Sequence, residues 1–410
     1  MLSVQEAQQQ ILAHFKALET SLIPLEQAAG RVLSEPIHSD TDLPPFDNSS
    51  VDGFALQSAD LTNPTRERPV TLNVVADIPA GSSSSIKIES GQAARIMTGA
   101  PLPAGADAVI MVEDTNFSRQ AAGSAAPKQV SVFKAVSAGE NIRGRGTDIR
   151  VGQNILDANR ALRAQDIGML AMLGISQVPV RRKPRVALLS SGDELLPVDA
   201  PLEPGKIRDS NTHTLAALAK NLGCDVLSLG VAADRYDAVL QLLDRAVEAQ
   251  PDVIISSAGV SVGAYDYVKE VVESGGSLNF WKVNMRPGKP LAFGEYRKIP
   301  FFGLPGNPVS SFVGFLVFVK PALERLNGLE IGGRDRIRVV LSEGLESDGR
   351  ESYLRAIINQ VDGVHYAKLT GHQGSGNLFS LVQANALLII PSGVKSCPPG
   401  SEAEAWLLES

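Results

Sequence analysis

Acidic side chains follow several of the apolar runs in this sequence. Runs at 186–189, 226–229 and 253–255 are followed by one set of carboxylates, Asp193, Glu194, Asp234 and Asp266. If these runs are parallel strands, their carboxyl ends meet at one edge of a sheet, where open α/β folds bind ligands. Four carboxylates at one edge repel one another unless a cation lies between them, so we predict a Mg²⁺-like ion there. A single carboxylate at such a place can instead cap a helix, and Asp266 is a candidate for that role.

Two glycine-rich turns follow predicted strands and precede predicted helices. They are Gly259-Val260-Ser261-Val262-Gly263 and Gly303-Leu304-Pro305-Gly306-Asn307-Pro308-Val309-Ser310. The backbone N–H groups of such turns can face an anion, for example a phosphate. The second turn is also a favourable helix start without any ligand, because proline suits the first helical position. Ser191 and Gly192 directly precede the acidic pair at 193–194 and belong to the same predicted edge.

Three cations lie close together between residues 280 and 290, namely Lys282, Arg286 and Lys289. Next to a group of carboxylates, they favour a phosphorylated or oxyanionic substrate. A solvated basic edge of the sheet is the alternative, and the residues alone leave both interpretations open.

The turn at 259–263 also matches the nucleophile elbow of α/β-hydrolases, with Ser261 as the nucleophile. Two histidines downstream, His365 and His372, stand where a catalytic base is expected. Both histidines lie in a β-rich tail, however, and no HGGG-type oxyanion segment precedes the turn. A serine hydrolase is therefore the weaker interpretation of this segment.

Composition excludes several classes of protein. The chain has 410 residues, which predicts two to four domains, and its net charge of -7 argues against binding to a nucleic-acid backbone. Two distant cysteines offer neither a disulfide framework nor a thiolate metal site. The N-terminus lacks the apolar core of a signal peptide, and the longest apolar run, 312–319, is too short to span a bilayer. We therefore expect a cytoplasmic protein without membrane or nucleic-acid partners.

The periodicity of apolar residues predicts the elements that position these groups. Helical spacing over 4–35 predicts two helices with a break near Pro24, and helical spacing returns over 158–173. Short β-rich runs separated by turns occupy about 50–140, and similar runs return after residue 335. Between these regions strands alternate with helices at 212–221, 236–248, 265–273 and from 308 onward. Such alternation predicts a parallel sheet covered on both faces.

An ordered set of segments resembles the molybdopterin molybdenumtransferase family, that is, the bacterial MoeA proteins and the E domain of gephyrin. The set spans 49–391 and consists of 49–55, 95–100 with 103–109, 139–143 with 146–148, 191–195, 209–211, 259–263 with 266–267, 287–290, 303–310, 374–376 and 384–386. In this chain Val51, Phe54, Ala258 and Ala386 depart from the residues that the family usually has. Arg286 stands where lysine is common, so a planar fork replaces a point charge.

The resemblance implies a multidomain α/β plus β fold. A central doubly wound α/β molybdopterin-binding domain would cover 179–330, and a C-terminal β-barrel would cover 331–410. An elongated helical domain would combine 1–45 with 140–178, with a β domain of 46–139 inserted in it. The resemblance further implies a homodimer whose active site combines residues of both subunits.

The resemblance also implies the reaction, which is insertion of molybdenum from molybdate into adenylylated molybdopterin with release of AMP. It adds Asp52, Thr98 and Asp148 to the catalytic residues Glu194 and Asp266, and Mg²⁺ would be held by Asp52, Glu194 and Asp266. The substrate-binding residues would be Ser191, Gly192, Asp193, Asp234, Gly259, Ser261, Gly263, Lys282, Arg286, Lys289, Pro305, Gly306, Asn307, Pro308, Ser310 and Ser375. Transient partners would be the adenylylating enzyme and apo-molybdoenzymes. The alternatives are a molybdopterin adenylyltransferase-type enzyme and a non-catalytic scaffold like the gephyrin E domain.

Overall fold

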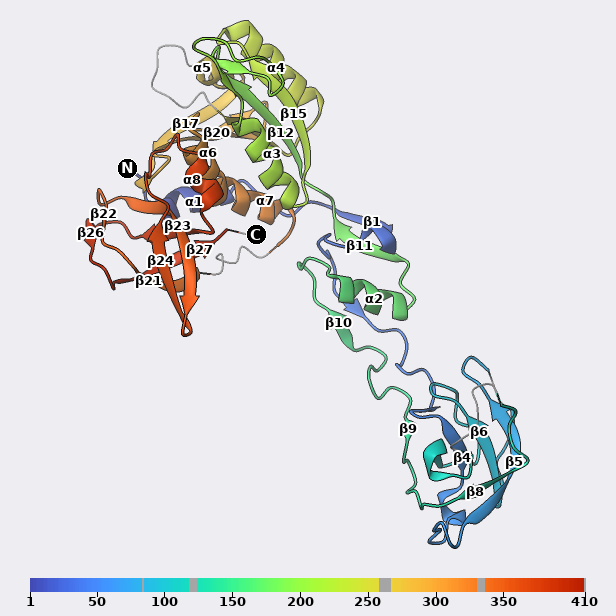
Figure 1. Cartoon of the computed structure of the whole chain (residues 1–410). Helices are drawn as coiled ribbons and strands as arrows, with labels where there is room; N and C mark the ends of the chain where they lie inside the picture. Colours follow the sequence, from blue (N-terminus) through green and yellow to red (C-terminus); the bar gives the residue numbers. More distant parts are fainter. Residues whose placement is uncertain (83–84, 118–123, 258–266, 330–335, 409–410) are drawn as a thin grey trace. The chain divides into compact units, whose positions relative to one another are not determined.

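The structure is a computed structural model that describes residues 1–82, 85–117, 124–257, 267–329 and 336–408 (Figure 1). The chain divides into two compact units. The larger comprises 1–35, 158–168 and 175–410, and the smaller comprises 36–157 and 169–174. The division of the chain into four domains stays a prediction.

A six-stranded sheet forms the centre of the larger unit, in the order β15-β12-β16-β20-β19-β17. Its bounds are β12 (Arg185–Ser191), β15 (Asp225–Ala232), β16 (Val253–Ser257), β17 (Gly276–Lys282), β19 (Pro290–Tyr296) and β20 (Ile299–Leu304). The first four strands in this order run parallel, whereas β19 and β17 run antiparallel to their neighbours. The predicted alternation of strands and helices is confirmed for this part of the chain.

Helices cover both faces of this sheet (Figure 1). On one face, α3 (Asn211–Asn221) and α6 (Pro308–Gly314) share a core with Val186 and Leu188 of β12. On the other face, α4 (Tyr236–Glu248) and α5 (Tyr267–Gly275) pack on Ala187 and Leu189. Successive residues of β12 point to opposite faces, so every residue after the exposed Arg185 is buried, and 186–189 form a continuous apolar run. The sheet and its helices therefore form a doubly wound α/β fold.

The helix predicted from residue 308 continues through a π-helical segment η4 (Phe315–Val319) into α7 (Lys320–Leu326). Pro321 lacks an N–H group and cannot donate to the carbonyl of Val317 four residues earlier. The side chain of Gln8 fills this place, because its Nε2 donates to the Val317 carbonyl at 2.8 Å. The contact ties the N-terminal helix α1 (Val4–Leu12) to the buried helix.

The N-terminal segment contains one helix where two were expected. Ser3 and Glu6 form a capping box at the start of α1, and Val4, Ala7 and Ile11 enter the core under the sheet. The second predicted helix before residue 35 is wrong, since β1 (Thr20–Pro24) is a strand that pairs with β11 (Gln177–Arg181). In β1, inward and outward residues alternate, and pairing with β11 satisfies its backbone groups. A 3₁₀ turn, η1 (Leu25–Gln27), follows.

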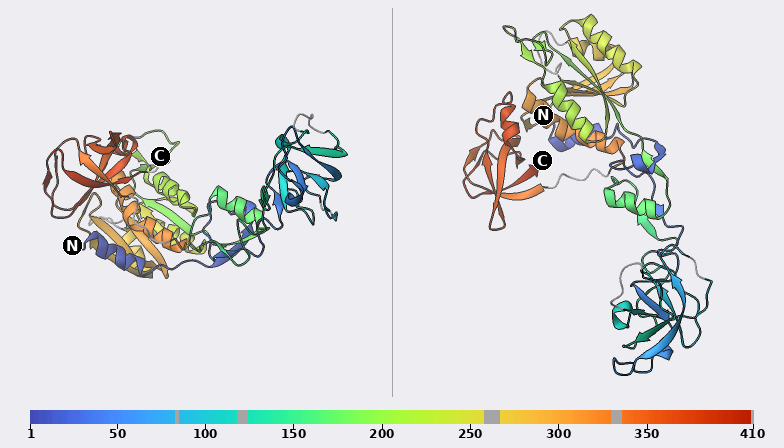
Figure 2. Two further views of the ribbon diagram at one scale, coloured as in Figure 1. Left: turned by 90° about the horizontal axis from the view of Figure 1, so that it is seen from below. Right: turned by 45° about the vertical axis from the view of Figure 1, so that its right-hand side comes forward.

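A closed β-barrel ends the chain, as predicted (Figure 2). Five strands close it in the order β23-β24-β21-β27-β25, with β25 pairing back to β23. The bounds are β21 (Arg336–Leu341), β23 (Glu351–Val361), β24 (Val364–Leu369), β25 (Ala386–Ile390) and β27 (Glu402–Leu407). β18 (Met285–Arg286) adds to β23 at the rim, and α8 (Phe379–Gln383) precedes β25. Smaller pairs are β22 (Leu345–Glu346) with β26 (Ser396–Cys397), and β13 (Leu195–Leu196) with β14 (Ile207–Arg208).

The smaller unit is built around a five-stranded sheet in the order β7-β4-β6-β5-β8. Its strands are β4 (Gly53–Leu56), β5 (Val70–Ile78), β6 (Gln92–Ile96), β7 (Ala108–Met111) and β8 (Gln129–Val132), which confirms the short β-rich runs predicted over about 50–140. Two short ladders join β3 (Asn48–Ser49) to β9 (Ile142–Arg143) and β2 (Ile37–His38) to β10 (Asn154–Leu156). The 3₁₀ turns η2 (Ser58–Asp60) and η3 (Val112–Asp114) complete this unit.

The predicted helix over 158–173 is present but shorter, as α2 (Ala164–Met172). Within the described residues, no helix is long and apolar enough to cross a membrane.

Candidate active site

The first strand-end group begins where β12 stops. Ser191 is buried and lies opposite Ala232 of β15 in the parallel register. Gly192 follows with φ +152°, and a Cβ atom there would lie 2.7 Å from Oε2 of Glu194. The carboxylate of Glu194 therefore folds back toward Gly192.

The next two acids hold each other through their backbones. The Asp193 N–H donates to Oδ2 of Asp234 at 3.3 Å, and the Asp234 N–H donates to Oδ1 of Asp193 at 3.1 Å. Burial raises the pKa of Asp234, the hydrogen bond from Asp193 lowers it, and the negative charges of Asp193 and Glu194 raise it again. The net effect is a raised pKa, so the ionised form of Asp234 lacks a compensating positive charge.

A cation would supply that missing charge, and oxygen ligands of this kind suit a hard divalent ion. Among the described residues, however, no three His, Cys, Asp or Glu side chains are placed to hold a metal ion. The predicted ligand Asp266 lies outside the described residues, as do Gly259, Ser261 and Gly263. The Mg²⁺ site thus stays a prediction. The acids at 193, 194 and 234 are consistent with it, because carboxylate oxygens are ligands that Mg²⁺ prefers.

Behind these acids lies a buried hydroxyl network that the sequence pattern did not reveal. Ser190 Oγ lies 2.8 Å from both Thr212 Oγ1 of α3 and Ser257 Oγ of β16. The three hydroxyls satisfy one another inside the sheet, so they fix the ends of two strands and the start of α3. Because hydroxyl groups are common in strands, only the tertiary structure distinguishes them.

The predicted basic segment is a loop between the antiparallel strands β17 and β19. Lys282 ends β17 opposite Pro290, and Arg286 lies on β18, where it pairs in register with Ser352 of the barrel. The loop is closed by a bond from the Val283 N–H to the carbonyl of Lys289 at 2.9 Å. Lys282, Arg286 and Lys289 therefore belong to one loop, and part of it is a barrel strand.

The turn at 305–310 meets both this loop and the C-terminal barrel. A Cβ at Gly288 would lie 3.5 Å from the Ser310 carbonyl. At the start of α6, the Val309 N–H donates to the carbonyl of Ser375 at 3.0 Å. The side chain of Asn211 donates to the carbonyl of Gly306 at 2.7 Å. The structure therefore brings the predicted segments 286–289, 305–310 and 375 together.

In the same region the barrel contains a cation that the sequence analysis missed. Arg355 is fully buried, and its guanidinium donates to Ser380 Oγ at 2.9 Å and to the carbonyls of His372 and Gly374. Burial, with a smaller contribution from Arg286, lowers its pKa to about 10, so it stays charged at neutral pH. Arginine is rarely buried without a carboxylate partner, and an arginine inside an apolar strand was the available signal.

Two of the remaining predicted residues contact each other in the smaller unit. Both the N–H and the hydroxyl of Thr98 donate to Oδ1 of Asp52, at 2.7 and 2.8 Å. The backbone bond, followed by the hydroxyl, lowers the pKa of Asp52, which is therefore ionised at neutral pH. Asp148 contacts neither of them and instead forms an ion pair with Arg143 of β9.

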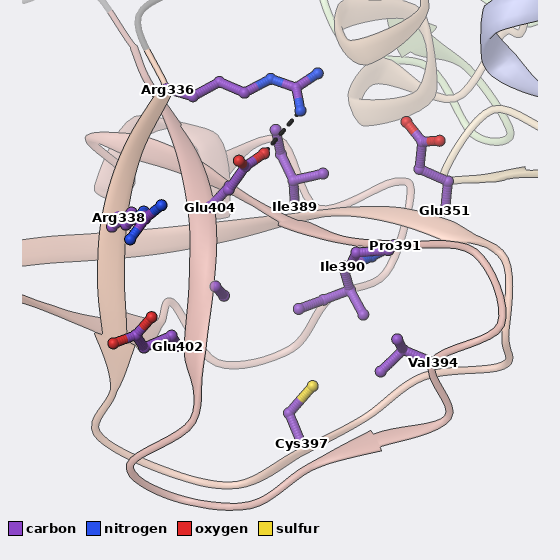
Figure 3. Close-up of a pocket in the computed structure, with 11 residues that line it drawn as sticks. Arg336, Arg338, Glu351, Ile389, Ile390, Pro391, Val394, Cys397, Glu402 and Glu404 are labelled. Carbon is purple, nitrogen blue, oxygen red and sulfur yellow. Dashed lines mark hydrogen bonds and ion pairs between the residues drawn. The ribbon is translucent and has the colours of Figure 1, made fainter.

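Of two cavities in the larger unit, one is lined by predicted site residues and the other is not. One of about 660 Å³ is lined by Gly192 and Asp193 together with residues of β15 and α3. Another, of about 430 Å³, lies on the barrel and is shown in Figure 3. The second cavity has an apolar floor around Ile390 and an ion pair between Arg336 and Glu404 at 2.7 Å. Since none of the predicted site residues lines it, the 660 Å³ cavity is the one that adjoins the candidate site.

Three family models match the chain. The model described as MoeA N-terminal region (domain I and II) matches residues 2–174. The probable molybdopterin binding domain matches 187–325, and the MoeA C-terminal region (domain IV) matches 338–408. A curated protein of Nostoc sp. named molybdopterin molybdenumtransferase is 40% identical over 382 residues, covering 92% of this chain and 86% of the relative. The chain belongs to the molybdopterin molybdenumtransferase family.

Other members of the molybdopterin molybdenumtransferase family support this assignment over the full length. Molybdopterin molybdenumtransferase 2 of Mycobacterium tuberculosis is 36% identical and covers 99% of both chains. A crystal structure of the MoeA protein of Pyrococcus horikoshii superposes with a TM-score of 0.85 at 30% identity, covering 100% of both chains. A molybdopterin molybdenumtransferase is a transferase of molybdenum cofactor biosynthesis, so the chain is an enzyme of that class. The serine-hydrolase interpretation of residues 259–263 is thereby set aside.

Proposed function

We propose that the protein inserts molybdenum from molybdate into adenylylated molybdopterin and releases AMP, in the last step of molybdenum cofactor biosynthesis. The observation that carries the proposal is the arrangement of Asp193, Glu194 and Asp234 at the carboxyl edge of the sheet. Their charges repel one another, and Asp234 has a raised pKa. A cation would neutralise this environment and could at the same time bind a phosphate ester.

The oxyanions of the substrate would bind to the basic loop between β17 and β19. Lys282, Arg286 and Lys289 supply positive charge on one loop, and that loop touches the turn before α6. Arg355 adds a buried positive charge that supports the loop around Gly374. Positive side chains that project from one loop suit molybdate or phosphate oxygens.

Glu194, Asp266 and Asp52 are the residues that would hold Mg²⁺, which would supply positive charge for cleavage of a phosphoanhydride. The chain's own residues position the groups around that bond. The carboxylate of Glu194 lies against Gly192, and Asp234 is directed by the backbone of Asp193. Ser191, at the end of β12, and the turn at Gly306–Ser310 would hold the substrate's phosphate or pterin.

Asp52 and Thr98 would complete the cleavage site. The two bonds from Thr98 keep Asp52 ionised and fix the direction of its free oxygen, so Asp52 can bind a cation or orient the attacking water. We assign Asp148 to the same site because of its place in the family motif. In this cleavage the water oxygen would bond to the adenylate phosphorus while the bond from that phosphorus to the bridging oxygen breaks, so that AMP is released and the bridging oxygen stays on molybdopterin phosphate.

We further propose that the protein acts in the cytoplasm as a homodimer, in which residues of both subunits form each site. The adenylylating enzyme and apo-molybdoenzymes would be transient partners. Sedimentation of the purified protein at micromolar concentration tests the dimer, and a monomeric mass at all concentrations would exclude it.

The test of the reaction uses purified protein, adenylylated molybdopterin and Mg²⁺. We expect AMP release to depend on added molybdate and to be lost in Asp52→Ala. Asp40→Ala is the matched control, because Asp40 is an exposed carboxylate of the same unit outside the site. If the intermediate binds but stays intact whatever oxyanion is added, the insertion reaction is excluded.

The same assay separates the alternatives. A molybdopterin adenylyltransferase-type enzyme would form the adenylylated intermediate from ATP and would not consume it with molybdate. A scaffold would release no AMP with either substrate, and substitution of Asp52 would then leave all measured properties unchanged.

A further inference from the structure

No part of the substrate has yet been assigned to the 660 Å³ cavity beside Asp193. Its walls are largely apolar and come from the segment after β12 and from the end of β15, with Leu195, Pro197, Val198 and Val231 among them. Thr212 and His213 of α3 line it as well. A flat heterocycle fits such a pocket, because ligand pockets of this size enclose ring systems between apolar walls.

One carboxylate of this cavity is buried and only partly used. Asp209 is 7% exposed, and its Oδ1 accepts a hydrogen bond from the Thr212 N–H at 3.1 Å. Its Oδ2 makes no hydrogen bond to any residue that the structure describes. A carboxylate oxygen that lines a cavity without a donor from the described residues is suited to a ligand that donates N–H groups.

The cavity is lined by more acidic than basic side chains, which disfavours an anionic ligand. Asp193, Asp199 and Asp209 line it, whereas His213 is the one basic side chain among the described lining residues. Lys206 is engaged elsewhere, since its ammonium group donates to the Asp193 carbonyl. Three carboxylates repel phosphate, so the phosphates of the substrate belong outside this cavity.

The substrate carries two heterocycles, and hydrogen-bond geometry distinguishes them. A pterin presents a ring N–H beside a 2-amino group, that is, two adjacent donors that match the two oxygens of a carboxylate. Adenine presents an amino donor beside a ring nitrogen that accepts, so a carboxylate repels half of that edge. Each carboxylate oxygen accepts two hydrogen bonds, and the bond from Thr212 therefore leaves Asp209 free to bind both donors.

We infer that this cavity is the pterin pocket of the substrate and that Asp209 selects the pterin over adenine. The inference rests on the proposed function, which supplies the substrate. It goes further by naming the residue that orients the substrate, with the pterin in the cavity and the phosphates directed toward Glu194 and Asp234.

The test measures binding of two ring probes by calorimetry at neutral pH. Pterin carries the 2-amino group, whereas lumazine has the same bicyclic ring with an oxygen at that position. We expect wild-type protein to bind pterin about 10- to 100-fold more tightly than lumazine, since hydrogen bonds to a charged group are worth that much. In Asp209→Asn the preference should fall below about threefold, because the amide offers only one acceptor.

Asp209→Asn keeps an oxygen that can accept from the Thr212 N–H, so the start of α3 should remain intact. Asp237→Asn is the control for loss of one charge, because Asp237 lies on α4 with its side chain 78% exposed. A wild-type protein that binds neither probe or both equally would overturn the inference. Preference for pterin that persists in Asp209→Asn would overturn it as well.

AMP release by the same wild-type preparation separates this result from the proposed function. Molybdate-dependent release without pterin preference would refute the pocket and leave the reaction in place. Pterin preference without any release would support the pocket and refute the reaction.

Discussion

The contact between Thr98 and Asp52 offers a sharp test of the smaller unit's role. Thr98 donates to one carboxylate oxygen twice, through its N–H at 2.7 Å and its hydroxyl at 2.8 Å. Thr98→Val removes the hydroxyl and keeps both the backbone bond and the branched shape of the side chain. The substitution therefore isolates one hydrogen bond to an ionised group.

The expected magnitude follows from the exposure of Asp52. A hydrogen bond to a charged group contributes about 1.5–3 kcal/mol, and solvent screening at an exposed carboxylate reduces this to about 1 kcal/mol. If the reaction needs the oriented carboxylate, that amount lowers kcat about fivefold. The pKa of Asp52 should rise toward its ordinary value, although the backbone bond, which is the larger cause of the shift, remains.

The sign of the pH dependence follows from the lowered pKa of Asp52. Its bonds with Thr98 stabilise the fold fully above the carboxyl pKa of the unfolded chain and are lost as the pH falls through the lower folded value. The difference in stability between wild type and Thr98→Val should therefore be present at neutral pH and disappear in acid. Urea unfolding at both pH values and the AMP-release assay measure the two effects. Thr98→Ser, which keeps a hydroxyl, should resemble wild type. Equal turnover in Thr98→Val and wild type would refute the orienting role.

Three further substitutions test other parts of the structure. Gly192→Ala places a methyl group 2.7 Å from Oε2 of Glu194, so that carboxylate must move. We expect AMP release to fall on the order of 100-fold while the circular dichroism spectrum stays unchanged, and full activity would contradict the placement of Glu194. Asp234→Asn removes an acid whose raised pKa destabilises the folded state at a pH above that pKa. Without Mg²⁺ the variant should therefore melt at a higher temperature than wild type at neutral pH, and this gain should be lost in acid. A lower melting temperature at neutral pH would show that the charges are already compensated. Gln8→Ala removes the donor to the Val317 carbonyl and should cost about 1 kcal/mol in urea unfolding, and an unchanged midpoint would show that another group, such as water, replaces it.

The α/β region could be predicted well from the sequence because local pattern and tertiary environment agree there. The helix predicted over 236–248 has those bounds in the structure, and its apolar residues face the sheet. Strands that are buried on both faces appear as short, continuous apolar runs, so β12 and β16 were evident. Rules for where ligands bind in open sheets then located Asp193, Glu194 and Asp234 correctly at one edge.

Errors arose where long-range pairing decides the structure. Leu18, Leu22 and Leu25 have helical spacing, yet 20–24 form a strand because β11, more than 150 residues away, pairs with it. For the same reason no local signal distinguished Asp209, since its place depends on a cavity that several elements form. Asp52 and Thr98 were found only through the family resemblance, because an acid next to a glycine in a turn has no pattern of its own.

The central claim is that cleavage of the adenylate is coupled to insertion of the metal. A single-turnover experiment tests this most directly: enzyme and adenylylated molybdopterin are mixed with molybdate and quenched at intervals, and AMP and cofactor-bound molybdenum are quantified in each sample. We predict that the two products appear in equal amounts and at the same rate. AMP that appears without bound molybdenum, or molybdenum that enters without loss of AMP, would contradict the account.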